Sequence, residues 1–184
     1  MQITPLTAAH APVYRTLMLE AYAQAADAFT STAEERAREP LTWWEQRLAS
    51  PLSESFGAFL DGALVGTVAL EYSARAKTRH SAHLIGMYVQ PAARGRHAGQ
   101  GLMEAAVAAA RARAGIRVVR LTVTEGNTAA IRLYEAMGFR AWGVEPWAID
   151  TPSGLQGKVH MALALDATMP QPVEWRALPL PGGL

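Results

Sequence analysis

The spacing of apolar residues changes several times along the chain, and each change predicts a different element. Residues 2–6 form a short apolar run that predicts a strand, and residues 8–26 carry apolar side chains at broadly helical spacing. After Pro40, residues 41–49 predict a second helix, whose two tryptophans we expect to cover a sheet. The first part of the chain is therefore predicted as a strand followed by two helices.

The next segment has the pattern of strands. Two apolar runs, residues 56–60 and 64–72, flank Asp61-Gly62, a dipeptide typical of a tight hairpin turn. A polar loop follows, and residues 83–90 form a further apolar run. This stretch predicts a hairpin and one more strand.

An alanine-rich helix and an apolar strand come next. Residues 101–114 place apolar side chains at helical spacing, and Gly115 ends the helix. Residues 118–124 form a run of β-branched residues and leucine, which is typical of a strand buried on both faces. Because a strand, a helix and a second strand form a crossover, the two strands are predicted to be parallel.

The last third predicts a helix and a second hairpin. Residues 128–137 form the helix, and Gly138 stands where a left-handed cap is expected. Strands follow near residues 140–149 and 159–165, joined by a turn over residues 151–157.

Length and composition fit one domain with a tail. The 184 residues are close to the roughly 150 of an average domain, which we assign to residues 1–166. Residues 167–184 contain four prolines and are predicted to be extended. The chain has no cysteine, which excludes disulfides, thiolate nucleophiles and cysteine-based metal sites.

Charge and hydropathy limit the partners. The 17 basic and 16 acidic residues give a net charge of +1, so no strong field draws the protein to nucleic acid or to an anionic membrane. The first ten residues lack the charged start and apolar run of a signal peptide, and no stretch approaches the ~20 apolar residues of a membrane span. We therefore expect a cytoplasmic protein that binds neither nucleic acid nor a membrane.

Residues 94–101, with the sequence RGRHAGQG, lie between a predicted strand and a predicted helix. Glycines let backbone N–H groups approach an anion, the helix start adds its positive dipole end, and two arginines supply charge. This predicts a diphosphate site, and a flexible loop with solvated arginines is the alternative. The Walker pattern is absent from the sequence. The dinucleotide pattern begins at Gly99 and Gly101, but Glu104 replaces its third glycine, although Glu125 stands where a ribose-binding acid could.

The strand and loop resemble the acetyl-CoA segment of the GNAT acetyltransferases. In that family a strand ending in valine precedes the pattern Q/R-x-x-G-x-G/A, and this chain has corresponding residues in order: Met87, Tyr88, Val89, Arg94 and Gly99. His97 replaces the middle glycine of the pattern, so its side chain either adds a hydrogen bond or narrows the site.

Residues 127–139 carry a second resemblance. Their sequence NTAAIRLYEAMGF is similar to the family segment N-x-x-A-x-x-L-Y-x-x-x-G-F, and the two segments with their surrounding strands cover roughly residues 65–165. In physical terms, Asn127 is a preferred N-cap, and Tyr134 lies two turns further on the same helix face, so both can point to one ligand. A capped helix with a half-buried tyrosine is the structural alternative.

The resemblance implies an α/β fold of the GNAT type: a mixed central sheet of about seven strands, with helices on both faces and a splayed parallel strand pair at its centre. It also implies transfer of an acetyl group from acetyl-CoA, without a metal, to a primary amine. The acceptor is expected to be an amino acid, a polyamine, an antibiotic-like amine or a peptide N-terminus. The residues expected to bind the cosubstrate are Met87, Tyr88, Val89, Arg94, Gly95, Arg96, His97, Ala98, Gly99, Gln100, Gly101, Asn127, Ala130 and Tyr134.

Tyr134 is the predicted catalytic acid. A phenol has a pKa of about 10 and a thiol one of about 8.5, so the phenol stays protonated and can donate to the departing thiolate. Direct attack then needs no covalent enzyme intermediate. The general base stays open among Glu71, His83 and Glu125. A metal pair of His80 and His83 is excluded because residues three apart on a strand face opposite sides.

Two other functions are weighed against acetyl transfer. One is a non-catalytic acyl-CoA sensor that kept the binding loop, and product formation separates it from an enzyme. The other is a nucleotide-dependent oxidoreductase, which a thermal-shift comparison of acetyl-CoA with NAD would reveal. Monomer and homodimer are both open.

Overall fold

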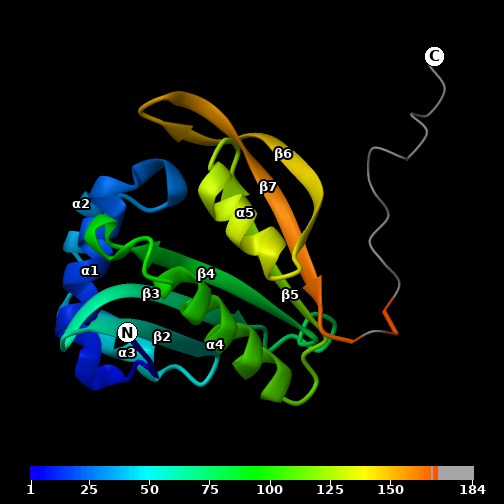
Figure 1. The fold of residues 1–184 in the computed structure, drawn as a ribbon, viewed down its shortest axis with the longest axis horizontal. Helices are drawn as coiled ribbons and strands as arrows, with labels where there is room; N and C mark the ends of the chain where they lie inside the picture. The colour runs from blue at the N-terminus through cyan, green and yellow to red at the C-terminus, as the bar shows by residue number, and fades with distance from the viewer. Residues whose placement is uncertain (167, 170–184) are drawn as a thin grey trace.

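A seven-stranded mixed sheet forms the centre of the protein, in the order β1-β2-β3-β4-β5-β7-β6 (Figure 1). The structure is a computed structural model that describes residues 1–166 and 168–169, so the predicted extended tail lies outside the described residues except for these last positions. The strands are β1 (Gln2–Pro5), β2 (Ser53–Leu60), β3 (Ala63–Tyr72), β4 (Ser81–Val89), β5 (Val118–Thr124), β6 (Arg140–Thr151) and β7 (Gly154–Ala164). The α-helices are α1 (Ala11–Gln24), α2 (Ala33–Ala37), α3 (Leu41–Ala49), α4 (Ala98–Ala112) and α5 (Thr128–Ala136), with short 3-10 turns η1 (Ala8–His10), η2 (Ala26–Ala28) and η3 (Pro91–Ala93).

The first four strands form an antiparallel half-sheet. β2 and β3 are joined by the predicted hairpin turn, in which Asp61 and Gly62 both have positive φ, at 50° and 81°. Two positive φ angles in succession match a type I′ turn, whose twist suits the flanking strands. The prediction of the hairpin from Asp61-Gly62 is therefore confirmed.

The predicted parallel pair is present, and it is short. β4 and β5 pair only over Ser81–His83 and Val118–Arg120, and beyond these residues the strands separate. Against β3, β4 carries an irregularity at which Gly86 and Met87 stand opposite Val68, and Gly86 has a φ of 62°. A bulge of this kind bends a strand, which accounts for the divergence of β4 from β5.

The C-terminal hairpin is longer than predicted. Gly138 caps α5 with a φ of 90°, as expected, and β6 then runs to Thr151. Thr151 pairs with Gly154, so the turn is Pro152-Ser153 and not the whole of residues 151–157. The prediction placed a loop there because the stretch is polar, but its outer side chains face solvent and still allow strand pairing.

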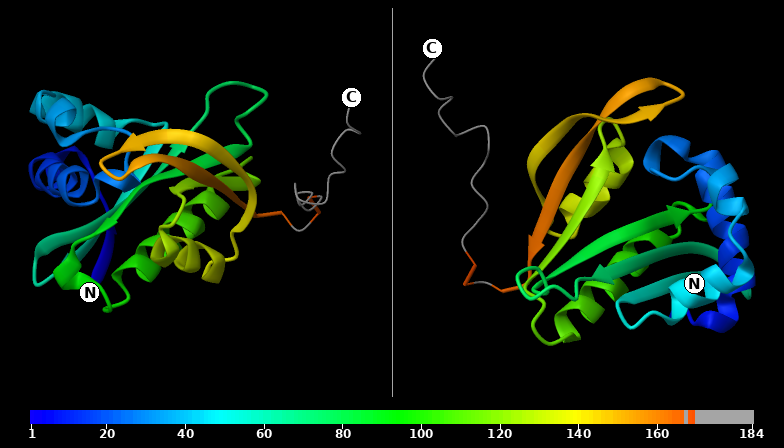
Figure 2. Two further views of the ribbon diagram at one scale, coloured as in Figure 1. Left: turned by 90° about the horizontal axis from the view of Figure 1, so that it is seen from above. Right: turned by 180° about the vertical axis from the view of Figure 1, so that it is seen from behind.

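The helices form unequal layers on the two faces of the sheet. α4 and α5 pack on one face, where side chains such as Leu102, Met103 and Tyr134 meet β3, β4, β5 and β7. On the other face, α1 and α3 pack together around Trp44 of α3 and cover the half of the sheet formed by β1 to β3. β5 and β7 lie away from this helical layer (Figure 2).

This arrangement corrects one prediction about β5. The strand is not buried on both faces, because Arg120 and Thr122 are exposed on the face that α1 and α3 leave open. No helix in the described part of the chain is long and apolar enough to cross a membrane.

Candidate functional site

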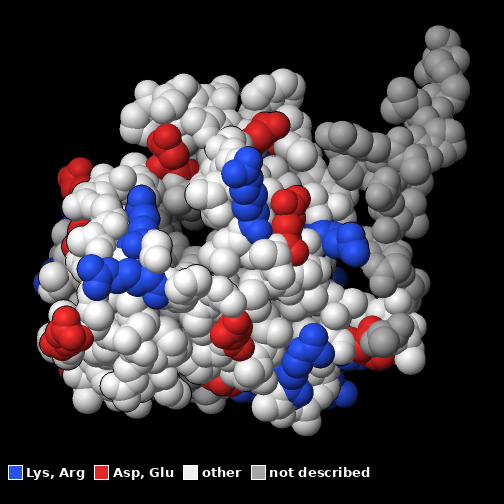
Figure 3. Space-filling model, in the orientation of Figure 1, with Lys and Arg blue, Asp and Glu red and all other residues white. Residues whose placement is uncertain are grey.

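The separation of β4 from β5 opens a cavity of about 700 Å³. Its walls are the two strands, the first turn of α4, one side of α5 and the segment around η2. All the residues predicted to bind the cosubstrate line this cavity except Arg96 and Gly101. In the space-filling view a hollow separates the N-terminal helices from the α5 region (Figure 3).

β4 contributes its backbone at the bulge, while the side chain of Tyr88 points elsewhere. The Tyr88 hydroxyl donates to Glu20 Oε1 at 2.9 Å, and Glu20 Oε2 accepts from the amide of Gln90 at 2.7 Å. Burial, together with this hydrogen bond to Glu20, raises the pKa of Tyr88 to about 12. The phenol therefore fixes β4 to α1 and is held away from the space between the strands.

The turn before α4 has two residues with left-handed backbone. Gly95 has a φ of 72°, and His97, the N-cap of α4, has a φ of 61°. A side chain at such a φ is strained, which explains why a glycine suits this position of the motif. The His97 ring is exposed, with Nδ1 3.4 Å from Gln100 Oε1, while Arg94 Nε donates to the Val89 carbonyl at 3.1 Å.

The two glycines in the first turn of α4 face different surroundings. A Cβ added at Gly99 would lie 3.3 Å from both Leu133 Cδ2 and Met87 Cε, which belong to the walls of the cavity. A Cβ added at Gly101 would lie 3.1 Å from Ile3 Cγ1, on the side of the helix that packs on β1. Gly99 therefore keeps the cavity open, and Gly101 allows the helix to pack.

α5 and its cap bring the three other predicted residues, Asn127, Ala130 and Tyr134, to the cavity. The side chain of Asn127 accepts from the Ala130 N–H at 3.3 Å, which caps the helix as expected. Tyr134, 6% exposed, lines the cavity, and its hydroxyl makes no hydrogen bond to another described residue. Burial raises the pKa of Tyr134 to about 12, so this phenol is protonated at neutral pH and free to donate.

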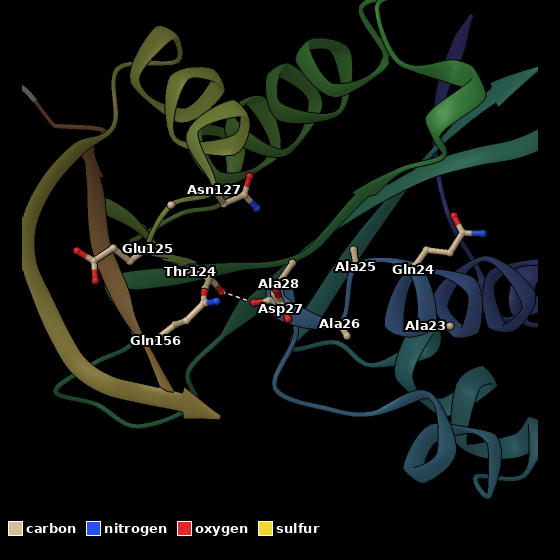
Figure 4. Close-up of a pocket in the computed structure, with 11 residues that line it drawn as sticks. Ala23, Gln24, Ala25, Ala26, Asp27, Ala28, Thr124, Glu125, Asn127 and Gln156 are labelled. Carbon is tan, nitrogen blue, oxygen red and sulfur yellow. Dashed lines mark hydrogen bonds between the residues drawn. The ribbon is translucent and has the colours of Figure 1, made fainter. Parts of the chain in front are cut away.

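A second cavity, of about 510 Å³, adjoins the first on the η2 side. It is lined by residues 23–28, residues 124–127 and Gln156, and it shares Ala25, Ala28, Thr124 and Asn127 with the larger cavity. Figure 4 shows Thr124, Gln156 and the η2 segment gathered around one space, with a hydrogen bond from the Thr124 hydroxyl to the Asp27 carbonyl.

None of the three predicted base candidates lines the larger cavity. Glu71 pairs with Arg47 at 3.2 Å, and His83 is its cross-strand neighbour on the open face of the sheet. Burial and the nearby Arg120 lower the pKa of His83. Glu125 lines only the smaller cavity, and its side chain turns away from that space toward β6 and β7 (Figure 4).

Lys158 is the residue at this site that the sequence reasoning missed. It lies on β7, is 7% exposed and lines the larger cavity. Its Nζ donates to Thr124 Oγ1 at 2.9 Å, and no carboxylate of a described residue lies within ion-pair distance of it. Burial lowers its pKa. The signal in the sequence was a single lysine within an apolar strand, in a chain that contains only one other lysine, Lys77.

Comparison with known sequences identifies a family. The sequence profile of the acetyltransferase (GNAT) family matches residues 18–139. A mycothiol acetyltransferase from Streptosporangium roseum is 49% identical over 57 residues, which are 31% of this chain and 17% of that protein. A mycothiol acetyltransferase from Thermobispora bispora is 47% identical over 57 residues, which are 31% of this chain and 19% of that protein. The chain therefore matches less than a fifth of the length of these two relatives.

Solved structures share the fold over nearly the whole chain. A GCN5-related N-acetyltransferase from Kribbella flavida superposes with a TM-score of 0.72 at 28% identity, covering 89% of this chain and 97% of that one. A ribosomal-protein-alanine N-acetyltransferase from Brucella melitensis gives a TM-score of 0.75 at 24% identity, covering 90% and 100%. A Salmonella typhimurium structure with its cofactor acetyl-CoA gives 0.76 at 22% identity, covering 92% and 96%.

Proposed function

Because the chain belongs to the GNAT family of acetyltransferases, we propose that it transfers an acetyl group from acetyl-CoA directly to a primary amine. The observation that carries this proposal is the cavity between β4 and β5, which has a glycine-rich helix start at one end and the Tyr134 phenol on its wall. The acceptor is a small amine, such as an amino acid, a polyamine or an antibiotic-like amine, or a peptide N-terminus. Residues 1–166 act as the catalytic domain.

The helix start is suited to hold the pyrophosphate of acetyl-CoA. The first N–H groups of an α-helix have no partner within the helix, and its N-terminal end carries a positive partial charge. The start of α4 lines the cavity from His97 to Gln100, and Arg94 adds a cation to the same wall. Gly99 leaves room beside Met87 for a chain to pass toward the interior of the cavity.

The diverging strands are suited to hold the pantetheine arm and the thioester. Beyond Arg120, β5 pairs only with β7, so its edge toward β4 has no strand partner. Unpaired backbone groups at such an edge bind an amide-containing chain as a strand would. Acetyl-CoA supplies an activated acyl group with a thiolate leaving group, and Tyr134 holds the proton that this thiolate needs.

The amine is proposed to enter through the smaller cavity. This cavity opens between η2 and the segment from β5 to α5, and it meets the larger cavity where Ala25 and Ala28 face Thr124 and Asn127. The relatives include both mycothiol and ribosomal-protein-alanine acetyltransferases, so the family alone does not select the acceptor.

A thiol-release assay tests the proposal. Purified protein is incubated with acetyl-CoA and each member of a panel of spermidine, an α-amino acid, an aminoglycoside and an alanyl tripeptide, and free CoA is measured. Release of CoA together with an acetylated amine in the mass spectrum supports the proposal. Calorimetric binding of acetyl-CoA without product from any amine supports the acyl-CoA sensor instead. A thermal shift with NAD and none with acetyl-CoA would refute both.

A further inference from the structure

We propose that the side-chain amine of Lys158 is the general base of acetyl transfer and takes a proton from the acceptor ammonium within the larger cavity. This inference rests on the proposed function, and it assigns a role that the predicted candidates Glu71, His83 and Glu125 do not fill.

The position of Lys158 places it opposite the catalytic acid. Along β5 and β7, Val123 pairs with Val159 and Thr124 pairs with Lys158. Val123 and Val159 pack in the same core as Tyr134, so Lys158, the neighbour of Val159, leaves the strand on the other face. Both Lys158 and Tyr134 nevertheless line the larger cavity, because the separated strands open it to both faces. A thioester between β4 and β5 therefore has the phenol on one side and the amine on the other.

The reacting amine has to come to the same cavity. Attack on a carbonyl carbon requires the two atoms to approach within about 3–3.5 Å, so an acceptor that enters past Thr124 must place its nitrogen beside the thioester. Thr124 borders both cavities and accepts a hydrogen bond from Lys158 Nζ at 2.9 Å. The Lys158 amine therefore lies beside the junction of the two cavities.

The surroundings of Lys158 favour a neutral amine. Glu145 is its cross-strand neighbour on β6, but the Glu145 carboxylate lies 3.2 Å from His160 Nε2. The Glu125 side chain is turned away from the smaller cavity and lies against Gly157. Its Oε2 atom is 2.7 Å from the position that a Cβ on Gly157 would occupy. From η2, Asp27 presents its backbone carbonyl to Thr124, and its carboxylate accepts from the Ser153 hydroxyl at 3.3 Å. Burial without an anion lowers the pKa of Lys158, which is the condition for a lysine base.

The step balances without a further reactant. An N–H bond of the acceptor ammonium breaks, and the proton passes to Lys158 Nζ. The freed lone pair forms the C–N bond, the C–S bond breaks, and the departing sulfur takes the proton of Tyr134. The Tyr134 phenolate then takes the second proton from the amide nitrogen, and Lys158 returns its proton to solvent. The net products are the amide, CoA and one proton.

The first test measures the ionisation of Lys158 and needs no acceptor. Because the chain has only two lysines, protein labelled with [15N]lysine gives two side-chain signals in an NMR titration, and Lys77, exposed in a loop, is the internal reference. We expect Lys158 to titrate well below Lys77. Titration of the two lysines at the same pH would overturn the inference, even if every amine of the panel proved inactive.

The second test compares Lys158→Met and Lys158→Arg with the unsubstituted protein, using the panel amine that gives the fastest CoA release. Methionine keeps an unbranched chain without a proton site, and arginine keeps the charge but cannot become neutral in this range. We expect kcat to fall about 10²-fold or more in both variants, with unchanged calorimetric affinity for acetyl-CoA. The pH at which kcat rises should match the pH at which Lys158 titrates in the NMR experiment. With the same acceptor, this rise of kcat with pH should be absent in Lys158→Met.

Two results would overturn the role as a base. If Lys158→Arg keeps kcat and Lys158→Met only raises the KM of the amine, Lys158 binds an anionic group of the acceptor. If neither variant changes kcat, Lys158 is structural. Absence of CoA release by the unsubstituted protein overturns the proposed function itself, and this result appears before any substitution is made.

Discussion

Replacing His97 with glycine should stabilise the ligand-free protein. His97 holds a φ of 61° and a ψ of 12° at the N-cap of α4. A left-handed conformation costs a residue with a Cβ roughly 1–2 kcal/mol, and glycine avoids this cost. Glycine also gives the unfolded chain more freedom, which offsets about 0.4–1 kcal/mol of the gain. The exposed contact between His97 and Gln100, at 3.4 Å, contributes little. The free energy of unfolding should therefore rise by about 0.5–1 kcal/mol, which raises Tm by about 1–4 °C for a chain of this size.

Chemical denaturation and calorimetry without acetyl-CoA measure this change. Arg96→Gly is the matched control, because Arg96 is the exposed neighbour and its φ is not positive. Glycine at that position only adds freedom to the unfolded chain and should lower the free energy of unfolding by about 0.4–1 kcal/mol. The two substitutions are therefore expected to act in opposite directions. Equal losses from both would show that His97 carries no backbone strain, and the account of the turn before α4 would be wrong.

Three further predictions concern the same site. Tyr134→Phe should keep the calorimetric affinity for acetyl-CoA while kcat falls by roughly 10²- to 10⁴-fold, and an unchanged kcat would remove Tyr134 from the role of acid. Because folding raises the pKa of Tyr134 to about 12 from an ordinary value near 10, its contribution to stability is complete below pH ~10 and is lost as the pH rises toward 12. Urea titrations at pH 9 and pH 11 should therefore show a larger loss for the unsubstituted protein than for Tyr134→Phe, and equal losses would contradict the pKa shift. Gly99→Val should mainly weaken acetyl-CoA binding and change Tm little. Gly101→Val should mainly lower Tm, because its added Cβ lies 3.1 Å from Ile3 and outside the cavity. Equal losses of acetyl-CoA affinity in the two variants would show that the two glycines have the same role.

The elements that local chemistry specifies were predictable from the sequence. Asp61-Gly62 adopts positive φ angles that few other dipeptides tolerate, and Gly138 ends α5 for the same reason. Asn127 caps its helix with its own side chain, an interaction that depends on three neighbouring residues only. The parallel pair followed from the crossover rule, which likewise needs no knowledge of distant contacts.

The features that the sequence did not predict depend on contacts between elements that are far apart along the chain. The apolar run of β5 does not reveal that α1 and α3 stop short of Arg120 and Thr122, because the helices that could cover them lie some 70 residues or more earlier. Lys158 was missed for a similar reason. Its amine contacts Thr124 on β5, whose hydroxyl in turn contacts η2, whereas a lone lysine in a strand is usually solvated. The base candidates chosen from the sequence were carboxylates and a histidine, whose chemistry is recognisable without a fold.

The short pairing of β4 with β5 would make the proposed acyl donor a part of the fold. Three residue pairs hold the two halves of the sheet together at one end, and further along they are joined by packing of the helices and by the contacts of η2 with Thr124 and Ser153. In the proposed binding mode, the donor would bridge the two halves as an extra strand does, and the sheet would become more rigid as the site fills. Within residues 84–89 and 121–124, the amide hydrogens that point into the gap between β4 and β5 should accordingly exchange more slowly while the donor is bound, whereas those paired with β3 or β7 are protected in both states. In a cell, the concentration of acetyl-CoA would thereby set the fraction of molecules whose two halves are locked against each other.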